Sequence, residues 1–446
     1  MSSELAAQIL KKIHQKNVDH AEVYLSLAKQ LKIEVRSQKV VAIEESAELG
    51  CGIRIIKNQQ LGFAFTSEFD AYVIDQTIDQ AISNACNCRP DEFNGLPKNG
   101  RTEEQKYLEL FDNTIAETAV EEKISLAKEI EKAAYSFDPR VNKTERVVYS
   151  DSATEIWLTN SYGLDANYQT NHCGGMAEII AGEPGAMEAG TGFRYVKKLA
   201  DLKAEQIGRE AAEQATQALG AKLISSQKVP LVFDPYTGSE ILSVLATMLS
   251  SEAVQKGKSM LAGKLGQIVG STCLNITDNG QLINGLGSAP FDAEGIPTQE
   301  TKLIIDGKLC SLLYNTYTAN KDKRRSTGNA SRGSFQSLPG VGTTNLFIEA
   351  GQIKPTAIIS SLKHGLYITR ILGLHTANPI SGHFSVGALG IMIEYGKKSF
   401  PVRGITIAGN ILEMFQALEA VGSDLQFFGE LGSPTLLIHN LTVSGS

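Results

Sequence analysis

The run from Ile380 to Asn410 constrains the fold more than any other part of this chain. It holds one alternating segment, a Tyr-Gly pair and a second alternating segment, which predicts two strands joined by a turn. Glycine recurs along it, at Gly382, Gly387, Gly390, Gly396, Gly404 and Gly409. Because glycine weakens a strand, this density predicts bulges, tight corners or the close approach of another backbone.

Length and charge limit the class of protein. The chain has 446 residues, of which 42% are apolar and 20% are charged. A chain of this length is larger than a domain with a single hydrophobic core usually is, so we expect two or three domains. The net charge of −7 disfavours a dedicated nucleic-acid-binding protein, which normally carries a basic surplus.

The sequence also bears on location. No apolar run is long enough to span a bilayer, and the N-terminal residues lack the basic-then-apolar order of a signal peptide. The six cysteines do not follow the spacing of a disulfide framework, which indicates reduced thiols. We therefore expect a cytoplasmic protein that does not contact a membrane.

Helix and strand signals divide the chain into three predicted units of the α+β class. The N-terminal domain, residues 1–105, is an α/β meander unit with strand signals over 21–66 and a helix capped by Asp70. It ends in a polar linker or long loop over residues 87–105. The middle α+β domain, residues 106–221, has strands between two helices. The C-terminal domain, residues 222–446, is larger and mostly β, with few helices.

Histidine placement argues against a helical zinc-peptidase site. Such a site needs two imidazoles on adjacent turns of a helix and a carboxylate that takes a proton from the bound water. The chain has seven histidines but no His-Glu dipeptide, and no two histidines lie close together on a predicted helix. His375 and His383 flank a glycine-rich turn and could converge, although exposed loop histidines are the simpler interpretation.

Charged residues gather in two loop-like stretches. Lys321-Asp-Lys-Arg-Arg325 and Arg332 form the strongest basic cluster, and their loop could cradle an anion or a peptide carboxylate. A solvated loop is the alternative. Asp292-Ala-Glu294 places two carboxylates on one turn, where they could act as a general acid and base. An ordinary acidic turn is the simpler interpretation.

Several stretches together resemble one known family. Pro290–Thr298 is similar to an acidic Asp-Glu-Gly segment, and Thr327–Ala330 is similar to a following loop. Pro339–Leu346 resembles the strand after that loop, and Ile380–Asn410 with Val421–Leu425 resembles a C-terminal signature. Val41–Phe65 and Asn160–Gly163 fit the N-terminal and middle regions. The chain resembles the TldD/PmbA family over nearly its whole length, and within it the PmbA-like (TldE-like) branch. That family contains a zinc peptidase subunit and a sister subunit without the metal site.

The resemblance implies that the metal site is missing here. In the peptidase branch a helix carries a His-Glu-x-x-x-His motif, and its positions fall on Ser243 to Met248. Ser243 and Met248 replace the histidines, and Val244 replaces the glutamate. A third ligand, a cysteine, should fall near Leu372, but no cysteine follows Cys310. No catalytic residue and no metal or other cofactor are therefore expected in this chain, and zinc is expected in a TldD-like partner.

The family then implies a partner role. Its metal-free members resemble the regulatory or structural half of a heterodimer that degrades or processes unfolded peptides, and a homodimer of this chain is the alternative. Substrate would bind as an added strand. The candidate peptide- and cavity-lining residues are Arg324, Arg325, Asn329, Arg332, Gly382, His383, Phe384 and Gly387.

Two other functions stay open. The chain could be a self-sufficient metallohydrolase with a different metal set built on His375 and His383. It could also be a binding module that acts on DNA gyrase or other topology proteins, as the family's older name of gyrase modulator suggests. Catalysis by this chain alone is not expected, because the zinc ligands and the glutamate base of the family motif are absent.

Overall fold

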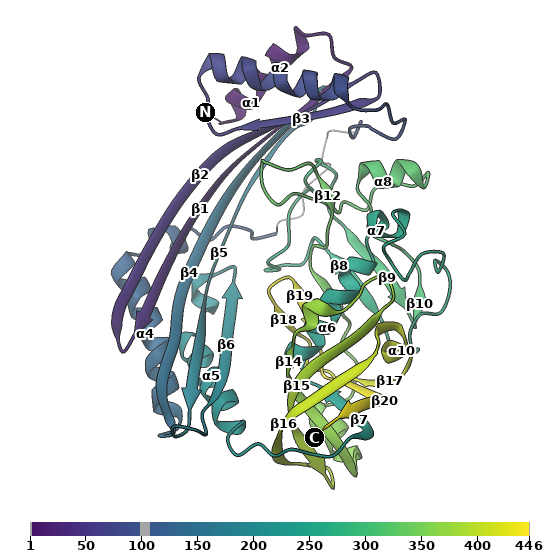
Figure 1. The fold of residues 1–446 in the computed structure, drawn as a ribbon. Helices are drawn as coiled ribbons and strands as arrows, with labels where there is room; N and C mark the ends of the chain where they lie inside the picture. Colours follow the sequence, from purple (N-terminus) through teal and green to yellow (C-terminus); the bar gives the residue numbers. More distant parts are fainter. Residues whose placement is uncertain (1, 99–107, 446) are drawn as a thin grey trace.

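The computed structural model describes residues 2–98 and 108–445 of the chain (Figure 1). The end of the predicted N-terminal domain and residues 99–105 of the predicted linker lie outside this range. One large antiparallel sheet has the strand order β3-β2-β1-β4-β5-β6. Its strands are β1 (His20–Arg36), β2 (Lys39–Lys57), β3 (Gln60–Thr66), β4 (Val141–Asn160), β5 (Asp165–Ala181) and β6 (Glu188–Val196).

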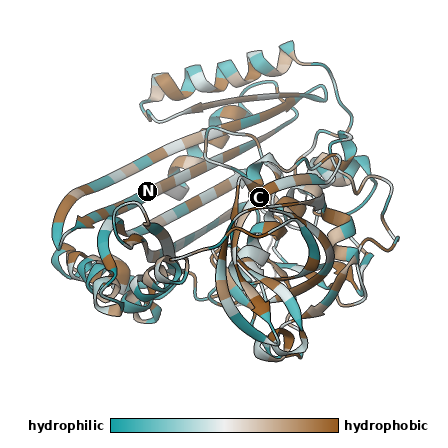
Figure 2. Ribbon diagram, turned by 60° about the horizontal axis from the view of Figure 1, so that its bottom comes forward, coloured by the Kyte–Doolittle hydropathy of each residue, from teal (hydrophilic) through white to brown (hydrophobic). Residues whose placement is uncertain are grey.

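Tight turns set the register of this sheet. Ser37 and Gln38 join β1 to β2, and Asn58 and Gln59 join β2 to β3, all with positive φ. Such two-residue turns match the twist of a hairpin. The separate strand signals over residues 21–66 therefore merge into fewer, much longer strands. Figure 2 shows hydrophobic and hydrophilic residues alternating along them, as expected of strands.

Helices cover the two ends of the long sheet (Figure 1). At one end α1 (Ser2–His14) and α2 (Ala71–Asn87) pack on the sheet through buried residues such as Ile13 and Ile78. As predicted, Asp70 caps α2, accepting hydrogen bonds from the next backbone N–H groups. At the other end α4 (Val120–Phe137) and α5 (Ala204–Gln217) pack through Ile130 and Ile207. The short α3 (Asn113–Glu117) and η1 (Leu199–Asp201) complete this half.

The predicted N-terminal and middle domains share this sheet. Strand β1 pairs with β2 on one side and with β4 on the other, from Glu22↔Asn160 to Val35↔Val147. The strands of the two predicted domains thus belong to one sheet, joined by a continuous set of backbone hydrogen bonds.

The C-terminal region is built around a closed barrel. Strands β16-β15-β14-β7-β20 form a sheet, and a further pairing of β16 with β20 closes it, with β17 at its edge. The strands are β7 (Gln227–Phe233), β14 (His364–Leu372), β15 (His383–Glu394), β16 (Lys397–Asn410), β17 (Leu418–Val421) and β20 (Leu436–Ser444). The barrel and the elements around it enclose the largest core, with Leu231, Leu366 and Val443.

The glycine-rich run forms β15 and β16, joined at Tyr395-Gly396 with positive φ, which confirms the predicted hairpin. Its expected irregularities are also present. The register shifts between Ala388 and Gly390, and a Cβ on Gly390 would lie 2.5 Å from the Tyr367 carbonyl oxygen. Only glycine allows so close an approach.

Shorter elements complete the C-terminal region. A mixed sheet has the order β10-β9-β8-β13-β19-β18, and β11 pairs with β12. These strands are β8 (Ile276–Asn279), β9 (Glu300–Ile305), β10 (Lys308–Leu309), β11 (Ala330–Ser331), β12 (Gly340–Val341), β13 (Leu346–Ile348), β18 (Gln426–Phe428) and β19 (Leu431–Ser433). The helices are α6 (Pro235–Met248), α7 (Ser251–Gln255), α8 (Thr316–Lys321), α9 (Pro355–Ser361), η2 (Leu374–Thr376) and α10 (Ile411–Gln416).

The α+β class with a larger, β-rich C-terminal region is therefore confirmed. The helical segment after β7 is interrupted at Leu249 and Ser250, so α6 and α7 are separate helices. Among the described residues, no helix is both long and apolar enough to cross a membrane.

Candidate functional site

A surface hollow lies beside α6, the helix that follows the barrel strand β7. Asp234 begins this helix by accepting hydrogen bonds from the Thr237 backbone N–H and hydroxyl, at 2.8 and 2.9 Å. The hollow has a volume of about 530 Å³. We call it the α6 hollow; its lining residues are Glu240, Ser243, Val244, Thr247, Ile371, Gly373, Leu374, His375, Ala377 and Pro379.

The helix positions that resemble the zinc motif divide between the hollow and the core. Ser243 and Val244 line the hollow, and the Ser243 hydroxyl donates a 2.6 Å hydrogen bond to the Glu240 carbonyl oxygen of its own helix. Met248 is fully buried and belongs to the barrel core instead. Neither of the two positions in the hollow supplies an imidazole or a thiolate, the ligands that zinc prefers.

The strand position near the expected third ligand meets the helix at the same hollow. Leu372 ends β14 and is 45% exposed, and its neighbours Ile371 and Gly373 line the hollow. His375 follows in η2 and also lines it, whereas His383 is an exposed residue at the start of β15 and does not. In the described parts of the chain, no group of three or more His, Cys, Asp or Glu residues could hold a metal ion.

The sequence reasoning missed Glu240. It faces the hollow, and burial together with the nearby charge of Asp234 raises its pKa to about 7, although Arg370 and Tyr236 act in the opposite direction. Its Oε2 atom is buried and, among the described residues, has no hydrogen-bond partner. The helical spacing could have found it, since Glu240, Ser243 and Thr247 lie three and seven residues apart on one face.

A second, polar cavity of about 190 Å³ lies between the long sheet and the loops of the C-terminal region. We call it the polar cavity; its walls are Tyr24, Ile156 and Tyr168 from the sheet and Gly287, Ala289, Phe291, Asp292, Ala293, Thr298, Gly328, Asn329, Ala330, Ser331, Arg332, Gly342, Thr343, Thr344 and Glu430 from the loops. Two of the predicted lining residues, Asn329 and Arg332, are therefore found here.

Both of these residues are already engaged by protein groups. The Asn329 amide donates to the Asp278 carboxylate at 2.7 Å. The Arg332 guanidinium lies 4.7 Å from the centre of the Tyr24 ring and forms an ion pair with Glu22. The cavity wall is thus braced by its own charges, which leaves Arg332 poorly suited to bind an anion.

A buried chain of ion pairs links the sheet to these loops. It consists of Arg332, Glu22, Arg54 and Glu294, and we call it the buried charge chain. Arg54 donates to Glu22 at 2.5 Å and to Glu294 at 2.7 Å. The turn that holds Glu294 is therefore not an ordinary exposed acidic turn.

The other carboxylate of that turn, Asp292, is also structural. It accepts hydrogen bonds from the backbone N–H groups of Glu294, Ile296 and Ala330, at 2.9 to 3.0 Å. Burial, followed by the charge of Glu294, raises its pKa. Asp292 thereby holds the turn against β11.

The remaining predicted lining residues lie elsewhere. Arg324 and Arg325 are exposed and line neither cavity. Phe384 packs in the barrel core, and Gly387 contacts Leu372 from the neighbouring strand. Gly382 has a positive φ of 73° and lies close to Met260. The structure does not bring the predicted set together in one cavity.

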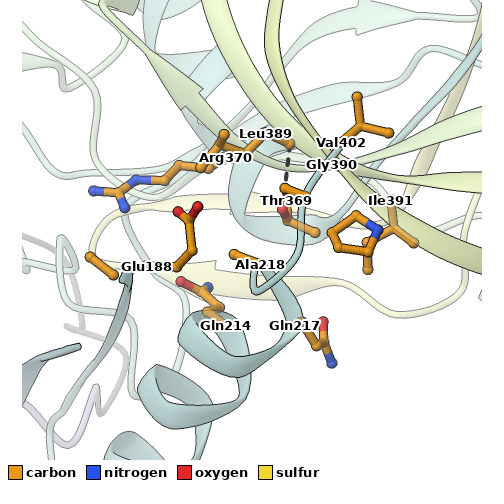
Figure 3. Close-up of a pocket in the computed structure, with 13 residues that line it drawn as sticks. Glu188, Gln214, Gln217, Ala218, Thr369, Arg370, Leu389, Gly390, Ile391 and Val402 are labelled. Atoms are coloured by element: carbon orange, nitrogen blue, oxygen red, sulfur yellow. Dashed lines mark hydrogen bonds between the residues drawn. The ribbon is translucent and has the colours of Figure 1, made fainter. Parts of the chain in front are cut away.

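A small crevice joins α5 to the barrel (Figure 3). Figure 3 shows the side chains of Glu188 and Arg370 reaching into it from opposite elements. The Thr369 hydroxyl donates to the Leu389 carbonyl oxygen at 3.4 Å, where β14 and β15 both shift register. This crevice lies where α5 and β6 of the long-sheet half meet the barrel strands β14, β15 and β16.

Comparison with known proteins identifies the family. The PmbA/TldA metallopeptidase models match residues 21–87 (domain 1), 113–219 (central domain) and 226–445 (C-terminal domain). The metalloprotease PmbA of Escherichia coli O157:H7 is 27% identical over 96% of this chain and 92% of its own.

Solved structures agree. A Thermotoga maritima protein whose name links it to modulation of a DNA gyrase has a TM-score of 0.92 and 27% identity, and the match covers 100% of both chains. TldE from Thermococcus kodakarensis shares the fold, with a TM-score of 0.89 and 23% identity over 99% of this chain and 100% of its own. The chain belongs to the PmbA/TldD metallopeptidase family.

Proposed function

We propose that this chain is a non-catalytic, PmbA/TldE-like subunit of a cytosolic zinc metallopeptidase complex. In this proposal it pairs with a TldD-like subunit that carries the zinc, and the pair degrades or processes unfolded peptides. The observation that carries the proposal is the α6 hollow. There Ser243 and Val244 stand beside the end of β14, where the peptidase branch would need an imidazole, a carboxylate base and a thiolate.

The chemistry supports this reading. Structural and catalytic zinc sites use three or four nitrogen, sulfur or oxygen ligands in a fixed geometry, and the free energy of binding comes from that whole set. In the α6 hollow, Ser243 is bound to its own helix and Met248 is turned into the core. A chain that keeps the family fold without these ligands fits a supporting role.

Peptide recognition in this proposal uses backbone hydrogen bonds. An extended peptide that adds to a sheet edge is recognised with little demand on its sequence, which suits the degradation of unfolded chains. The segment from Gly382 to Gly387 and the polar cavity with Asn329 and Arg332 are the proposed lining regions. The partner is a TldD-like subunit, and a homodimer is the alternative.

Co-purification with a TldD-like subunit tests the proposal. The tagged chain should retain the subunit, and unfolded peptides should be cleaved by the pair but not by this chain alone. Ser243→Ala is the matched control, because it removes a hydroxyl that contacts only its own helix, and the pair should keep its activity. Full peptidase activity of the TldD-like subunit without this chain, together with no retention, would contradict the proposal.

One observation favours a second candidate. His375 lines the α6 hollow together with Glu240, so a self-sufficient metallohydrolase would use this place. Stoichiometric metal that is lost in His375→Ala would support it. The gyrase role carried by the name of the Thermotoga maritima relative is a third candidate, and salt-dependent retention on DNA that is lost when Arg324 and Arg325 are neutralised would support it.

A further inference from the structure

The walls of the α6 hollow are mostly apolar. Val244, Ile371, Leu374, Ala377 and Pro379 supply most of its lining. Its volume of about 530 Å³ is in the range of pockets that hold small ligands or single side chains. Apolar walls of this kind bind the hydrocarbon part of a ligand, and a polar group among them selects the functional group at the end of that ligand.

Glu240 is that polar group. Its Oε2 atom is buried and, within the described residues, accepts no hydrogen bond. A buried acceptor without a partner destabilises the protein, because it has lost its hydrogen bonds to water. Glu240 also lines the hollow, so a ligand that donates a hydrogen bond to its carboxyl group from there would offset part of the cost of burying that group.

The surroundings favour a cationic donor. Asp234 and Tyr236 lie near Glu240 on its own helix, and Arg370 is near enough on β14 to act on its charge. Tyr236 acts on Glu240 through a side-chain hydrogen bond and Arg370 through its charge, and a second cation from a ligand would favour the ionised carboxylate further. His375 is the other titratable group on the wall, from η2.

We propose that the α6 hollow binds a lysine or arginine side chain of an extended peptide. Glu240 receives the cationic end, and the apolar walls hold the methylene stem, as long basic side chains commonly pack. The exposed apolar residues Leu372 and Ile380, 45% and 53% accessible, lie next in sequence to wall residues and contact the neighbouring peptide residues. This inference rests on the proposed function in one respect, that the chain meets unfolded peptides.

A metal ion is a poorer fit to the same place, because Glu240 and His375 lack a third ligand among the described residues. An anion is also a poorer fit, since it would face the Glu240 carboxyl group, which repels it when ionised. In this proposal, the hollow at the positions that resemble the zinc motif binds a side chain of the peptide instead of a metal ion.

The test measures fluorescence anisotropy of short, unstructured, labelled peptides with the full-length chain. One peptide carries a single central lysine, a second carries norleucine at that place, and a third carries glutamate. Lysine should bind about tenfold more tightly than norleucine, as a charge-assisted hydrogen bond would give. Glu240→Gln should abolish this preference, and Glu240→Lys should transfer it to the glutamate peptide.

Glu413→Gln on α10 is the matched control, because Glu413 is exposed and does not line the hollow. It should keep the lysine preference, and far-ultraviolet circular dichroism should show all variants folded. Equal binding of lysine and norleucine by the unaltered chain, or a preference that survives in Glu240→Gln, would overturn the inference. If the unaltered chain supports cleavage with its partner but does not prefer lysine, only this inference is contradicted. If it prefers lysine but does not support cleavage with a partner, only the proposed function is contradicted.

Discussion

Arg54 donates a 2.7 Å hydrogen bond to the carboxylate of Glu294, and both side chains are at least 94% buried. The two residues lie 240 positions apart in the chain, on β2 and on a loop of the C-terminal region. Because Arg54 also binds Glu22 on β1, one guanidinium ties the long sheet to the loops that wall the polar cavity.

Arg54→Leu tests this link. Removing the guanidinium leaves Glu294 buried without its cation, and breaking a buried ion pair in this way costs about 3–5 kcal/mol of unfolding free energy. Urea denaturation measures the loss. Arg36→Leu is the control, since Arg36 is about half exposed at 49% and its contact with Glu34 is long, at 3.7 Å. A loss in Arg54→Leu no larger than that in Arg36→Leu would show that the link is dispensable.

Glu131 stabilises the turn between β1 and β2. Its carboxylate accepts hydrogen bonds from the backbone N–H groups of Ser37 and Gln38 at 2.7 and 2.6 Å, and Glu131 itself is fully buried. Glu131→Gln replaces one acceptor oxygen by a donor, so we expect a loss of about 1–3 kcal/mol and faster hydrogen exchange at the turn. Glu129→Gln, an exposed change on the same helix, should leave exchange at the turn unaltered. Unchanged exchange in Glu131→Gln would contradict the capping role.

Asp234 should make stability depend on pH. Burial is the main cause that raises its pKa to about 6 from 3.8, so the folded chain holds this proton to a higher pH than the unfolded chain does. Its contribution is fully present below about pH 4 and is lost as the pH rises through 6. Asp234→Asn keeps the capping oxygen but does not titrate.

Denaturation of both proteins at pH 4 and pH 7.5 provides the measurement. The stability of the unaltered chain relative to Asp234→Asn should fall by about 2–3 kcal/mol between these values. A constant difference at the two pH values would rule out the raised pKa.

Gly62 allows β3 and α2 to approach closely. A Cβ at this position would lie 2.0 Å from the Ala81 carbonyl oxygen, so Gly62→Ala must push the helix away from the sheet. Overpacking of this kind costs about 1–3 kcal/mol. Gly333→Ala is the control, because its Cβ would meet nothing nearer than the Ser337 hydroxyl at 4.0 Å. Thermal unfolding should separate the two variants, and equal melting temperatures would contradict the close packing.

Local patterns made part of this structure predictable. The Tyr395-Gly396 and Asp306-Gly307 turns have the positive φ values that such pairs favour, and the strands beside them follow from alternation. Asp70 as a helix cap rests on equally local chemistry. These features depend only on neighbours in the sequence.

Long-range pairing was not predictable in the same way. The pairing of β1 with β4 merges two predicted units into one sheet, and no local signal marks which strand edges will meet. The buried charge chain is another case, since Glu22 stands in a strand where an exposed polar residue would look identical in the sequence. Its burial depends on Arg54 and Arg332, which reach it only in the folded chain.

The candidate site was predictable in part. Ser243, Val244 and the neighbours of Leu372, which the resemblance singled out, line one hollow. Met248 lies in the core instead, because a helix turns by about 100° per residue. Glu240 lies one turn before the motif positions, and only its side-chain environment shows that it lacks a partner.

Zinc analysis of the purified chain tests the central claim most directly. The chain is produced alone with zinc supplied, freed of loosely bound metal by dialysis, and measured by mass spectrometry for zinc per polypeptide. The account predicts far less than one zinc ion per chain, and no change in His375→Ala. One zinc ion per chain that is lost in His375→Ala would contradict it.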